Sequence, residues 1–333
     1  MCLLAIAATP RRASAAQGVA LRVAVPVALL VALAFGSLAG CASTEPGSVR
    51  STPVLTLEAV NAIVANPERS AADRTNDRRR QPIDLLNFIG VRPGMVALDI
   101  SAGGGYTTEL LARAVGPIGR VYGQSPPPAP AVAGAPLTTS PPTPPRRTSA
   151  MALAERAKTV PNIVAVVRPF DDPVPPELAM QKLDLVTLMY NYHDLGHLGV
   201  DRAAMNKAIF AALKPGGMYV IADHAGRKGT GISESDTLHR VEEEFVAREV
   251  AAAGFQLAEQ GMFLRNPNDP RDRETPLPPE KKDEFVLKFV KPTGAGSAGA
   301  TKIGEPYALA ATLAATNSRN SRFMILPTGL IGN

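Results

Sequence analysis

Apolar segments long enough to form strands alternate with segments whose apolar residues recur at helical spacing, from about residue 54 to residue 292. Such alternation predicts one α/β domain built on a doubly wound, Rossmann-like sheet with mostly parallel strands. The last two strands have no helical pattern between them, which predicts that the last strand is antiparallel. Seven strands are expected, at residues 95–100, 120–124, 162–168, 183–190, 218–223, 256–264 and 284–290.

Helix start and stop signals divide the chain between these strands. Pro82 in a first turn and Gly90 after the last apolar residue bound one helix, and Gly254 closes another. The arginine-rich stretch 69–80 is expected to be a solvated charged helix, with a cap over cofactor or substrate as the alternative. Helices are expected at residues 55–65, 82–89, 106–115, 203–213 and 237–253.

Two segments lack the pattern of a packed core. Residues 125–149 are rich in proline and carry only two charges, and residues 293–333 begin with repeated glycine, alanine and serine. Neither composition offers enough apolar area to offset the entropy of ordering the chain. The expected organisation is therefore one folding unit at 54–292 that contains the first segment as an insertion, preceded by a tether at 42–53 and followed by a flexible tail.

The first 41 residues are typical of a secretion signal. Basic residues precede the apolar run 23–38, and Leu38-Ala39-Gly40-Cys41 follows. This ending resembles a bacterial lipobox, which implies that Cys41 is lipidated. Because no aspartate follows that cysteine, the expected product is an outer-membrane lipoprotein facing the periplasm. An uncleaved anchor and an ordinary signal peptide are the alternatives. Cys2 is the only other cysteine, so the mature chain can form no internal disulfide.

The overall charge gives no support for a nucleic-acid partner. The net charge is +5, but three of the 35 basic residues lie in residues 1–41, which hold no acidic residue. The remainder has 32 basic and 30 acidic side chains. A near balance of charge does not supply the basic surface on which nucleic-acid binding depends, so no nucleic-acid partner is expected.

A glycine-rich turn after the first predicted strand carries the clearest chemical signal. Residues 96–105 read Val-Ala-Leu-Asp-Ile-Ser-Ala-Gly-Gly-Gly, and a helix is predicted directly afterwards. Glycines at such a turn let a ligand approach the backbone, where helix N–H groups and the positive end of the helix dipole face it. Asp99, just before the turn, suits a ligand with a positive charge or an amino group. The order Gly-Gly-Gly-Tyr-Thr-Thr from Gly103 departs from the nicotinamide pattern Gly-x-Gly-x-x-Gly.

This turn resembles the first motif of the class I S-adenosylmethionine-dependent methyltransferases, Asp-x-Gly-x-Gly-x-Gly, with Ser101 in place of the first glycine. Leu183-Asp184-Leu185-Val186 and Leu213-Lys214-Pro215-Gly216-Gly217 resemble the fourth-strand and fifth-strand motifs of the same class. Asn191-Tyr192-His193-Asp194 and several later motifs resemble a poorly characterised family of predicted bacterial methyltransferases. The resemblance covers about residues 55–292 and implies the methyltransferase fold, S-adenosylmethionine as cofactor, and methyl transfer.

The resemblance also implies roles for individual residues. Gln124 ends the second strand, where class I enzymes commonly place an acid that holds both ribose hydroxyls. An amide can accept one such hydrogen bond, without the strength that a carboxylate gives it. Asp171 and Asp172 follow the third strand, where the family often contacts adenine. The expected cofactor-binding residues are Asp99, Ser101, Gly103, Gly105, Gln124, Asp171, Asp172 and Asn191.

Histidines supply the candidate chemistry, since methyl transfer needs a base only when the acceptor carries a proton at neutral pH. The chain has four, all after the fourth and fifth strands, at the edge where open α/β sheets bind ligands: His193, His197, His224 and His239. His193 is the predicted general base, with Asp194 or Asp223 to orient it, and His224 is a second catalytic candidate. One alternative is a purely structural cluster. The other is a divalent metal site, for which the ligand types fit but the sequence spacing matches no known motif: His193, Asp194, Asp223, His224 and His239.

Two functions from different classes compete. The first is methyl transfer from S-adenosylmethionine to a small-molecule or envelope acceptor. The second is a lipid-anchored, non-catalytic binding or scaffold protein that retains the fold, which the lipobox favours because the cofactor is made in the cytoplasm. The retained glycines, Asp99 and the histidines favour the enzyme, which is the function predicted here. A nicotinamide-dependent oxidoreductase is not favoured, because this chain lacks both the third glycine and the ribose-binding acid of such enzymes.

Overall fold

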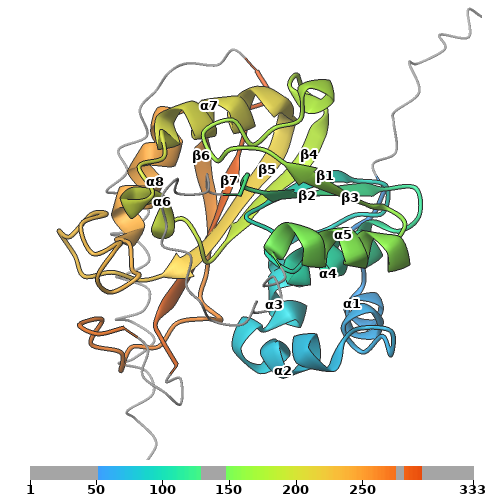
Figure 1. The fold of residues 1–333 in the computed structure, drawn as a ribbon, viewed down its shortest axis with the longest axis horizontal. Helices are drawn as coiled ribbons and strands as arrows, with labels where there is room; N and C mark the ends of the chain where they lie inside the picture. The colour runs from blue at the N-terminus through green and yellow to red at the C-terminus, as the bar shows by residue number, and fades with distance from the viewer. Residues whose placement is uncertain (1–51, 129–147, 275–280, 295–333) are drawn as a thin grey trace, which may run out of the picture. The chain divides into compact units, whose positions relative to one another are not determined.

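A seven-stranded sheet organises the part of the chain that the computed structural model describes, residues 52–128, 148–274 and 281–294 (Figure 1). The strand order is β3-β2-β1-β4-β5-β7-β6. Neighbours from β3 to β5 are parallel, and β7 runs antiparallel between β5 and β6. This confirms the predicted methyltransferase-type sheet, its antiparallel last strand included. The strands are β1 (Val96–Ile100), β2 (Arg120–Ser125), β3 (Ile163–Val167), β4 (Leu183–Met189), β5 (Leu213–His224), β6 (Gln256–Gly261) and β7 (Glu284–Val290).

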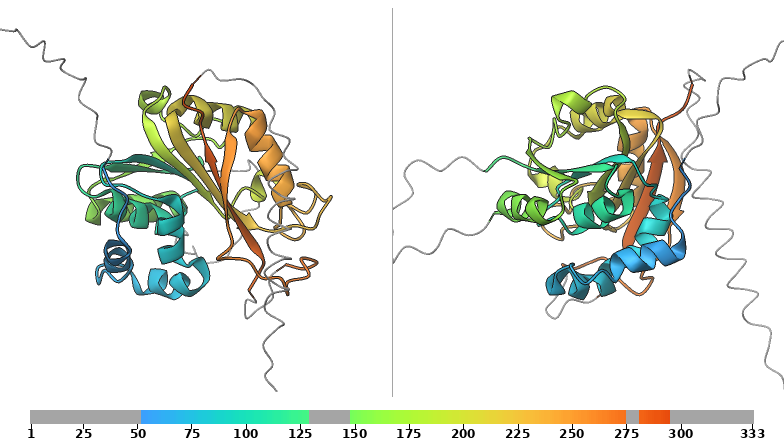
Figure 2. Two further views of the ribbon diagram at one scale, coloured as in Figure 1. Left: turned by 180° about the vertical axis from the view of Figure 1, so that it is seen from behind. Right: turned by 90° about the vertical axis from the view of Figure 1, so that its right-hand side faces the viewer.

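Helices cover both faces of the sheet (Figures 1 and 2). Apolar side chains of α1, α3, α4 and α5 join the core on one face, and those of α7 and α8 join the core on the other. The described helices are α1 (Leu57–Val64), α2 (Ala71–Arg80), α3 (Pro82–Ile89), α4 (Tyr106–Val115), α5 (Ser149–Thr159), α6 (Asp194–His197), α7 (Arg202–Ala212) and α8 (Glu243–Ala252), with one 3₁₀ turn at Pro176–Leu178.

The two-residue period of the strands divides their side chains between these two cores. In β1, Leu98 and Ile100 face the α7 and α8 side, whereas Ala97 faces the α4 side. In β4, Val186 likewise faces the α7 and α8 side, and Leu185 faces the α4 side. Strands buried on both faces are apolar almost throughout, which is why the sequence shows them so clearly.

Several elements differ from the sequence prediction: α6 and the 3₁₀ turn are not predicted, and β6 ends at Gly261 rather than at residue 264. The last predicted helix starts at Glu243 rather than at residue 237, because His239 takes a left-handed conformation (φ 48°) that no helix interior accepts. Helix α5 is not predicted, since Leu153 is its only buried residue and no apolar stripe marks it. Strand β5 begins at Leu213, ahead of the predicted residue 218, with a register shift against β4 across the proline-glycine turn.

Several predictions concern other parts of the chain. The signal segment 1–41, with Cys41, lies outside the described residues, as does most of the tether 42–53, the insertion 125–149 and the tail 293–333. Within the described ranges, no helix is both long and apolar enough to span a membrane.

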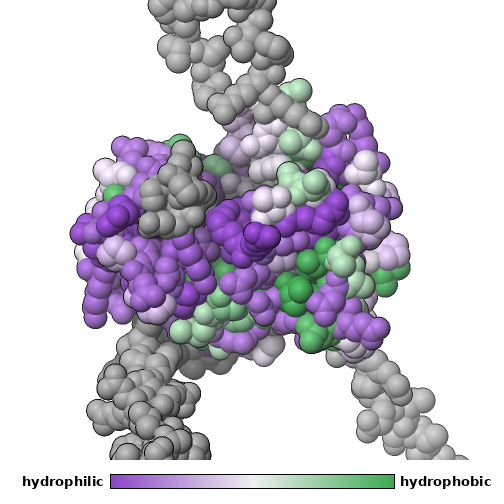
Figure 3. Space-filling view, turned by 90° about the horizontal axis from the view of Figure 1, so that it is seen from below, coloured by the Kyte–Doolittle hydropathy of each residue, from purple (hydrophilic) through white to green (hydrophobic). Residues whose placement is uncertain are grey.

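Figure 3 shows the molecule from below relative to Figure 1, and the surface of the described residues on this side is mostly hydrophilic. Its apolar residues form small separate groups. Single exposed apolar side chains are normal for a soluble surface and need no partner to explain them. The large ones come from many different elements and loops: Val54, Leu57, Ile118, Met151, Val167, Met180, Leu198 and Met262.

Candidate functional site

The glycine-rich turn between β1 and α4 has the left-handed backbone that its sequence requires. Ser101, Gly103 and Gly105 have φ angles of 56°, 56° and 86°. Ser101 takes this conformation although it replaces the usual glycine. A Cβ atom on Gly103 would meet nothing within 4 Å, whereas one on Gly105 would lie 2.8 Å from Arg156 and 2.9 Å from Leu153. Gly103 therefore leaves backbone open to a ligand, and Gly105 is required by the close approach of α5.

Asp99 lies beneath this turn and is almost fully buried. Its two carboxylate oxygens each accept a hydrogen bond of 2.7 Å, one from the Thr108 hydroxyl of α4 and one from the Thr187 hydroxyl of β4. Burial raises the pKa of Asp99 to about 6, although both hydroxyls and Arg80 act to lower it. The carboxylate thus joins β1, β4 and α4. Neither threonine could be predicted as its partner, because no sequence motif marks them.

Gln124 is fully buried and holds the turn through its side chain. Its Oε1 accepts a hydrogen bond from the Ser101 amide at 2.9 Å, and its Nε2 donates to the Arg168 carbonyl at 2.5 Å. A carboxylate could accept the first bond but could not donate the second. Both polar atoms of the buried Gln124 side chain are thus bonded to backbone groups, which gives the amide a structural role beside the predicted ribose contact.

The two aspartates after β3 are exposed at the same edge of the sheet. Asp172 forms an ion pair with Arg168, whose Nε also donates to the Asp172 carbonyl at 3.0 Å. Asp171 lies beside it in the same loop. Gln124 links this loop to the glycine-rich turn, because its side chain bonds both the Ser101 amide and the Arg168 carbonyl.

Helix α2 is mostly exposed, as its composition predicts, but some of its polar side chains dock against neighbouring elements. Its Arg80 guanidinium lies 4.1 Å from the ring centroid of Tyr190, at the end of β4, and 5.5 Å from that of Tyr106, at the start of α4. The Tyr106 hydroxyl donates to Asp77 of α2 at 2.7 Å. Arg69, just before α2, is buried and pairs with Asp77 through two hydrogen bonds. The polar side chains of α2 therefore dock it over the glycine-rich turn.

All four histidines of the chain meet in one cluster beyond the carboxyl ends of β4 and β5. The ring of His193 lies 5.4 Å from that of His224 and 5.6 Å from that of His239, and His197 lies 5.9 Å from His239. They come from three places in the sequence, namely α6 with the residue before it, the end of β5, and the turn before α8. The predicted proximity of these side chains is thus observed.

His193 is buried between two carboxylates. Its Nδ1 lies 2.6 Å from Asp223 Oδ1, its amide donates to Asp223 Oδ2 at 2.8 Å, and its Nε2 lies 3.1 Å from Asp194 Oδ1. Burial acts to lower the pKa of His193, but Asp223 and Asp194 outweigh it and raise this pKa to about 9. At neutral pH the ring carries both protons. In this state it has no lone pair to accept another, which does not suit the predicted general base.

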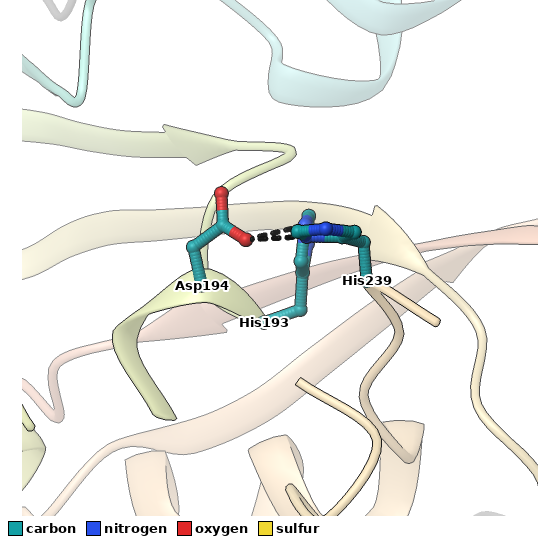
Figure 4. Close-up of side chains that lie close together, drawn as sticks. All are labelled: His193, Asp194 and His239. Atoms are coloured by element: carbon teal, nitrogen blue, oxygen red, sulfur yellow. Dashed lines mark hydrogen bonds and ion pairs between the residues drawn. The ribbon is translucent and has the colours of Figure 1, made fainter. Parts of the chain in front are cut away.

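Asp194 connects the side chains of His193 and His239 (Figure 4), and it also bonds that of Asn191. Its Oδ1, the oxygen that also faces His193, lies 2.9 Å from His239 Nδ1. Its Oδ2 accepts a hydrogen bond from Asn191 Nδ2 at 2.8 Å. Burial acts to raise the pKa of Asp194, but the two histidines hold it well below its usual range. Asn191, predicted to bind cofactor, therefore orients Asp194. The side-chain carbonyl oxygen of Asn191 is buried with no hydrogen-bond partner among the described residues.

His224 lies on the other side of His193. Burial lowers the pKa of His224 to about 3, so its ring is neutral at pH 7. Its Nδ1 lies 3.1 Å from Glu284 Oε1 at the start of β7. Burial raises the pKa of Glu284, despite an Arg79 guanidinium 3.6 Å away. Neither His193 nor His224 has the near-neutral pKa that favours general-base catalysis, and Glu284 has no role predicted from the sequence.

No family model matches the chain, and no curated protein matches it in sequence. Among solved structures, a "SAM dependent methyltransferase" from Aquifex aeolicus covers 71% of this chain and 99% of its own, at 14% identity and a TM-score of 0.46. A chain of the complex between the Haloferax volcanii Trm112 methyltransferase activator and "the putative methyltransferase" covers 73% and 100%, at 17% identity and a TM-score of 0.45. The arsenic (III) S-adenosylmethionine methyltransferase CrArsM from Chlamydomonas reinhardtii covers 72% and 74%, at 15% identity and a TM-score of 0.44. At these identities the likeness concerns the fold alone.

Proposed function

We propose that this chain binds S-adenosylmethionine on the glycine-rich turn and transfers its methyl group to a small-molecule or envelope acceptor. The observation that carries the proposal is the open backbone at Gly103, in a left-handed turn that leads directly into the N-terminus of α4. The turn lies at the carboxyl ends of parallel strands, where open α/β sheets bind ligands. Amide groups at a helix start suit the polar groups of a nucleoside ligand.

The side chains around the turn suit a ligand with separate positive and negative groups. Tyr106 and Tyr190 present aromatic rings on which a cation is stabilised, as the Arg80 guanidinium on both of them demonstrates. A sulfonium or ammonium group can use the same rings. The Arg80 guanidinium in turn matches the amino-acid carboxylate of the cofactor. Asp171 is exposed at the same edge for the adenosine hydroxyl and amino groups.

Two predicted cofactor ligands take a supporting role in this proposal. The hydrogen bonds of Asp99 and Gln124 hold β1, β2, β4 and α4 around the turn. They fix the backbone that would contact the cofactor, which requires no direct bond from either side chain. Pre-organisation of this kind increases affinity because less chain must be ordered on binding.

When bound, the cofactor would supply a methyl carbon attached to a positively charged sulfur; an acceptor lone pair would bond to that carbon as the carbon–sulfur bond breaks and the neutral thioether leaves. The contribution of the chain is alignment of donor and acceptor, which accounts for much of the rate in such displacements. With His193 cationic and His224 a weak base, the cluster favours an acceptor that is already nucleophilic at neutral pH. The acceptor lies on the side of the histidine cluster in this proposal.

Calorimetric titration of the purified full chain with S-adenosylhomocysteine tests the proposal. Gly103→Asn places a side chain in the open space while keeping a residue type that tolerates a left-handed backbone. It should lower the affinity at least about tenfold, which corresponds to 1.4 kcal/mol. Gly90→Asn is the matched control, since Gly90 also has a positive φ (73°) and open space but caps α3.

Equal affinities in both variants, or no binding by the wild-type chain at millimolar ligand, would contradict the proposal. The second result would favour the non-catalytic scaffold instead.

We also infer that the chain is anchored in the bacterial envelope through Cys41, on the strength of the lipobox-like sequence alone. Cys41→Ser should release the protein from membranes and stop its labelling by palmitate. Persistent membrane association of that variant would point to residues 23–38 as an uncleaved helix.

A further inference from the structure

Two imidazoles and one carboxylate converge on a single point at the edge of the histidine cluster (Figure 4). One nitrogen of His193, one nitrogen of His239 and one oxygen of Asp194 all lie within 4.8 Å of one another. Asp194 Oδ1 lies 3.1 Å from His193 Nε2 and 2.9 Å from His239 Nδ1. We infer that these three side chains form a binding site for a divalent transition-metal ion, represented by Zn²⁺.

The separations of the three ligand atoms fit an ion with little rearrangement. Metal–ligand distances in zinc sites are about 2.0–2.2 Å, which places neighbouring ligand atoms of a tetrahedral site about 3.4 Å apart. Asp194 Oδ1 is only a little closer than that to each histidine nitrogen. Small side-chain rotations, together with release of the proton on His193 Nε2, therefore admit the ion, and the backbone need not move.

Groups behind the three ligands already orient them. Asp223 Oδ1 lies 2.6 Å from His193 Nδ1, which turns His193 Nε2 toward the site. Asn191 Nδ2 donates a hydrogen bond to Asp194 Oδ2 at 2.8 Å, which turns Asp194 Oδ1 toward the site. A carboxylate behind a metal-binding histidine is the usual arrangement of metal sites, since it fixes the ring and raises its basicity.

One side of the site is accessible to solvent. The His193 side chain is only 5% exposed, whereas those of Asp194 and His239 are 25% and 39% exposed. Three protein ligands with an accessible fourth position are characteristic of catalytic rather than structural zinc sites. Water or an acceptor oxygen would take that position.

The ligand chemistry selects the kind of ion. Imidazole nitrogen with carboxylate oxygen suits Zn²⁺ and Fe²⁺, whereas Mg²⁺ prefers oxygen ligands only and keeps several waters. His197 does not belong to the set. Its Nδ1 lies 3.0 Å from Ser235 Oγ but 3.9 Å from Asp194 Oδ1. It therefore serves as a control from within the same cluster.

The metal site does not depend on the proposed methyl transfer. Both sites lie at the carboxyl edge of the sheet, one after β1 and the other after β4 and β5. If both are present, the ion would orient an oxygen-bearing acceptor. Metal binding and cofactor binding are measured separately, so that a failure to bind one ligand does not contradict the proposal for the other.

The test uses the full chain, purified without a polyhistidine tag and stripped of metal with a chelator. We expect one Zn²⁺ per chain by calorimetry, visible d–d absorption on addition of Co²⁺, and much weaker binding of Mg²⁺. Asp194→Asn and His239→Asn should each reduce Zn²⁺ affinity about 100-fold or more, and Asp223→Asn about 10–100-fold. Asparagine at residue 239 tolerates the left-handed backbone there, which keeps the turn intact.

His197→Asn should leave Zn²⁺ affinity unchanged, and circular dichroism should show that all four variants are folded. Equal Zn²⁺ affinity in the wild-type chain, Asp194→Asn and His239→Asn would overturn the inference. So would absence of the Co²⁺ band in the folded wild-type chain, or an equal loss of affinity in His197→Asn.

Discussion

Single residues in this chain act mainly through the groups that they hold. Gln124 shows this most clearly, because its amide both accepts from the Ser101 amide and donates to the Arg168 carbonyl. The sequence reveals that an acid is absent from this position. It cannot reveal that an amide is needed there, since both partners are backbone groups on other loops.

The same limit applies to the histidines. Their clustering after β4 and β5 could be predicted, because the carboxyl ends of parallel strands share one edge of the sheet. Their protonation states could not. Burial acts to lower the pKa of both His193 and His224; Asp223 and Asp194 outweigh it for His193, whereas for His224 burial outweighs Asp223 and lowers the pKa.

Asp99 provides a prediction at this scale. The folded-state pKa, about 6, lies above the ordinary value of 3.8, so the stabilising effect of the protonated form is complete below about pH 4. It is lost as the pH rises through 6, by up to about 3 kcal/mol. The free energy of unfolding of the wild-type chain should therefore fall between pH 4 and pH 6.5 relative to that of Asp99→Asn. Urea denaturation of both proteins across this range measures the difference, and parallel curves would contradict the assignment.

At the scale of elements, the strands and the charged helix were predictable, whereas the docking of that helix was not. Buried parallel strands are apolar throughout, so their positions follow from the sequence, and α3 and α4 follow from proline and glycine at their ends. Helix α2 has almost no apolar residues, and its docking depends on ion pairs with residues far away in the chain. No local pattern carries that information.

Arg156 of α5 joins these elements and gives the second prediction. Its guanidinium donates to the Gly104 carbonyl at 2.7 Å and to Asp73 of α2 at 2.6 Å, and it also pairs with Glu109 of α4. Arg156→Gln leaves two nearly buried carboxylates without that partner, so it should lower the free energy of unfolding by roughly 3 kcal/mol.

Lys158→Gln is the control on the same helix, because the Lys158 side chain is 69% exposed and pairs only with Glu155 at the surface. It should cost less than about 0.5 kcal/mol. Chemical denaturation compares the two variants, and similar losses would show that Arg156 does not connect the elements.

At the scale of the whole molecule, the chain combines a methyltransferase-type sheet with a segment typical of a lipoprotein signal. The sheet topology was predictable because strand–helix alternation and the missing last helix determine it. The limits of the folding unit stay a prediction from composition, since residues 295–333 offer little apolar area for a core.

Two truncations test that limit. Removal of residues 295–333 should change the melting temperature by no more than about 2 °C. Removal of residues 291–333 also deletes Lys291, whose Nζ donates to the carbonyls of Phe210 and Leu213 at 2.7 and 2.8 Å. That loss should lower the melting temperature by roughly 5 °C. An equal, large drop in both truncations would place the boundary of the folding unit beyond residue 294.

The most direct test of the central claim is hydrogen–deuterium exchange of the full chain with and without S-adenosylhomocysteine. A ligand on the glycine-rich turn should slow exchange of the amides at residues 101–106 and in the loop at residues 168–172. Exchange in β6, at the far edge of the sheet, should stay unchanged. Unaltered exchange at residues 101–106 under saturating ligand would contradict the account.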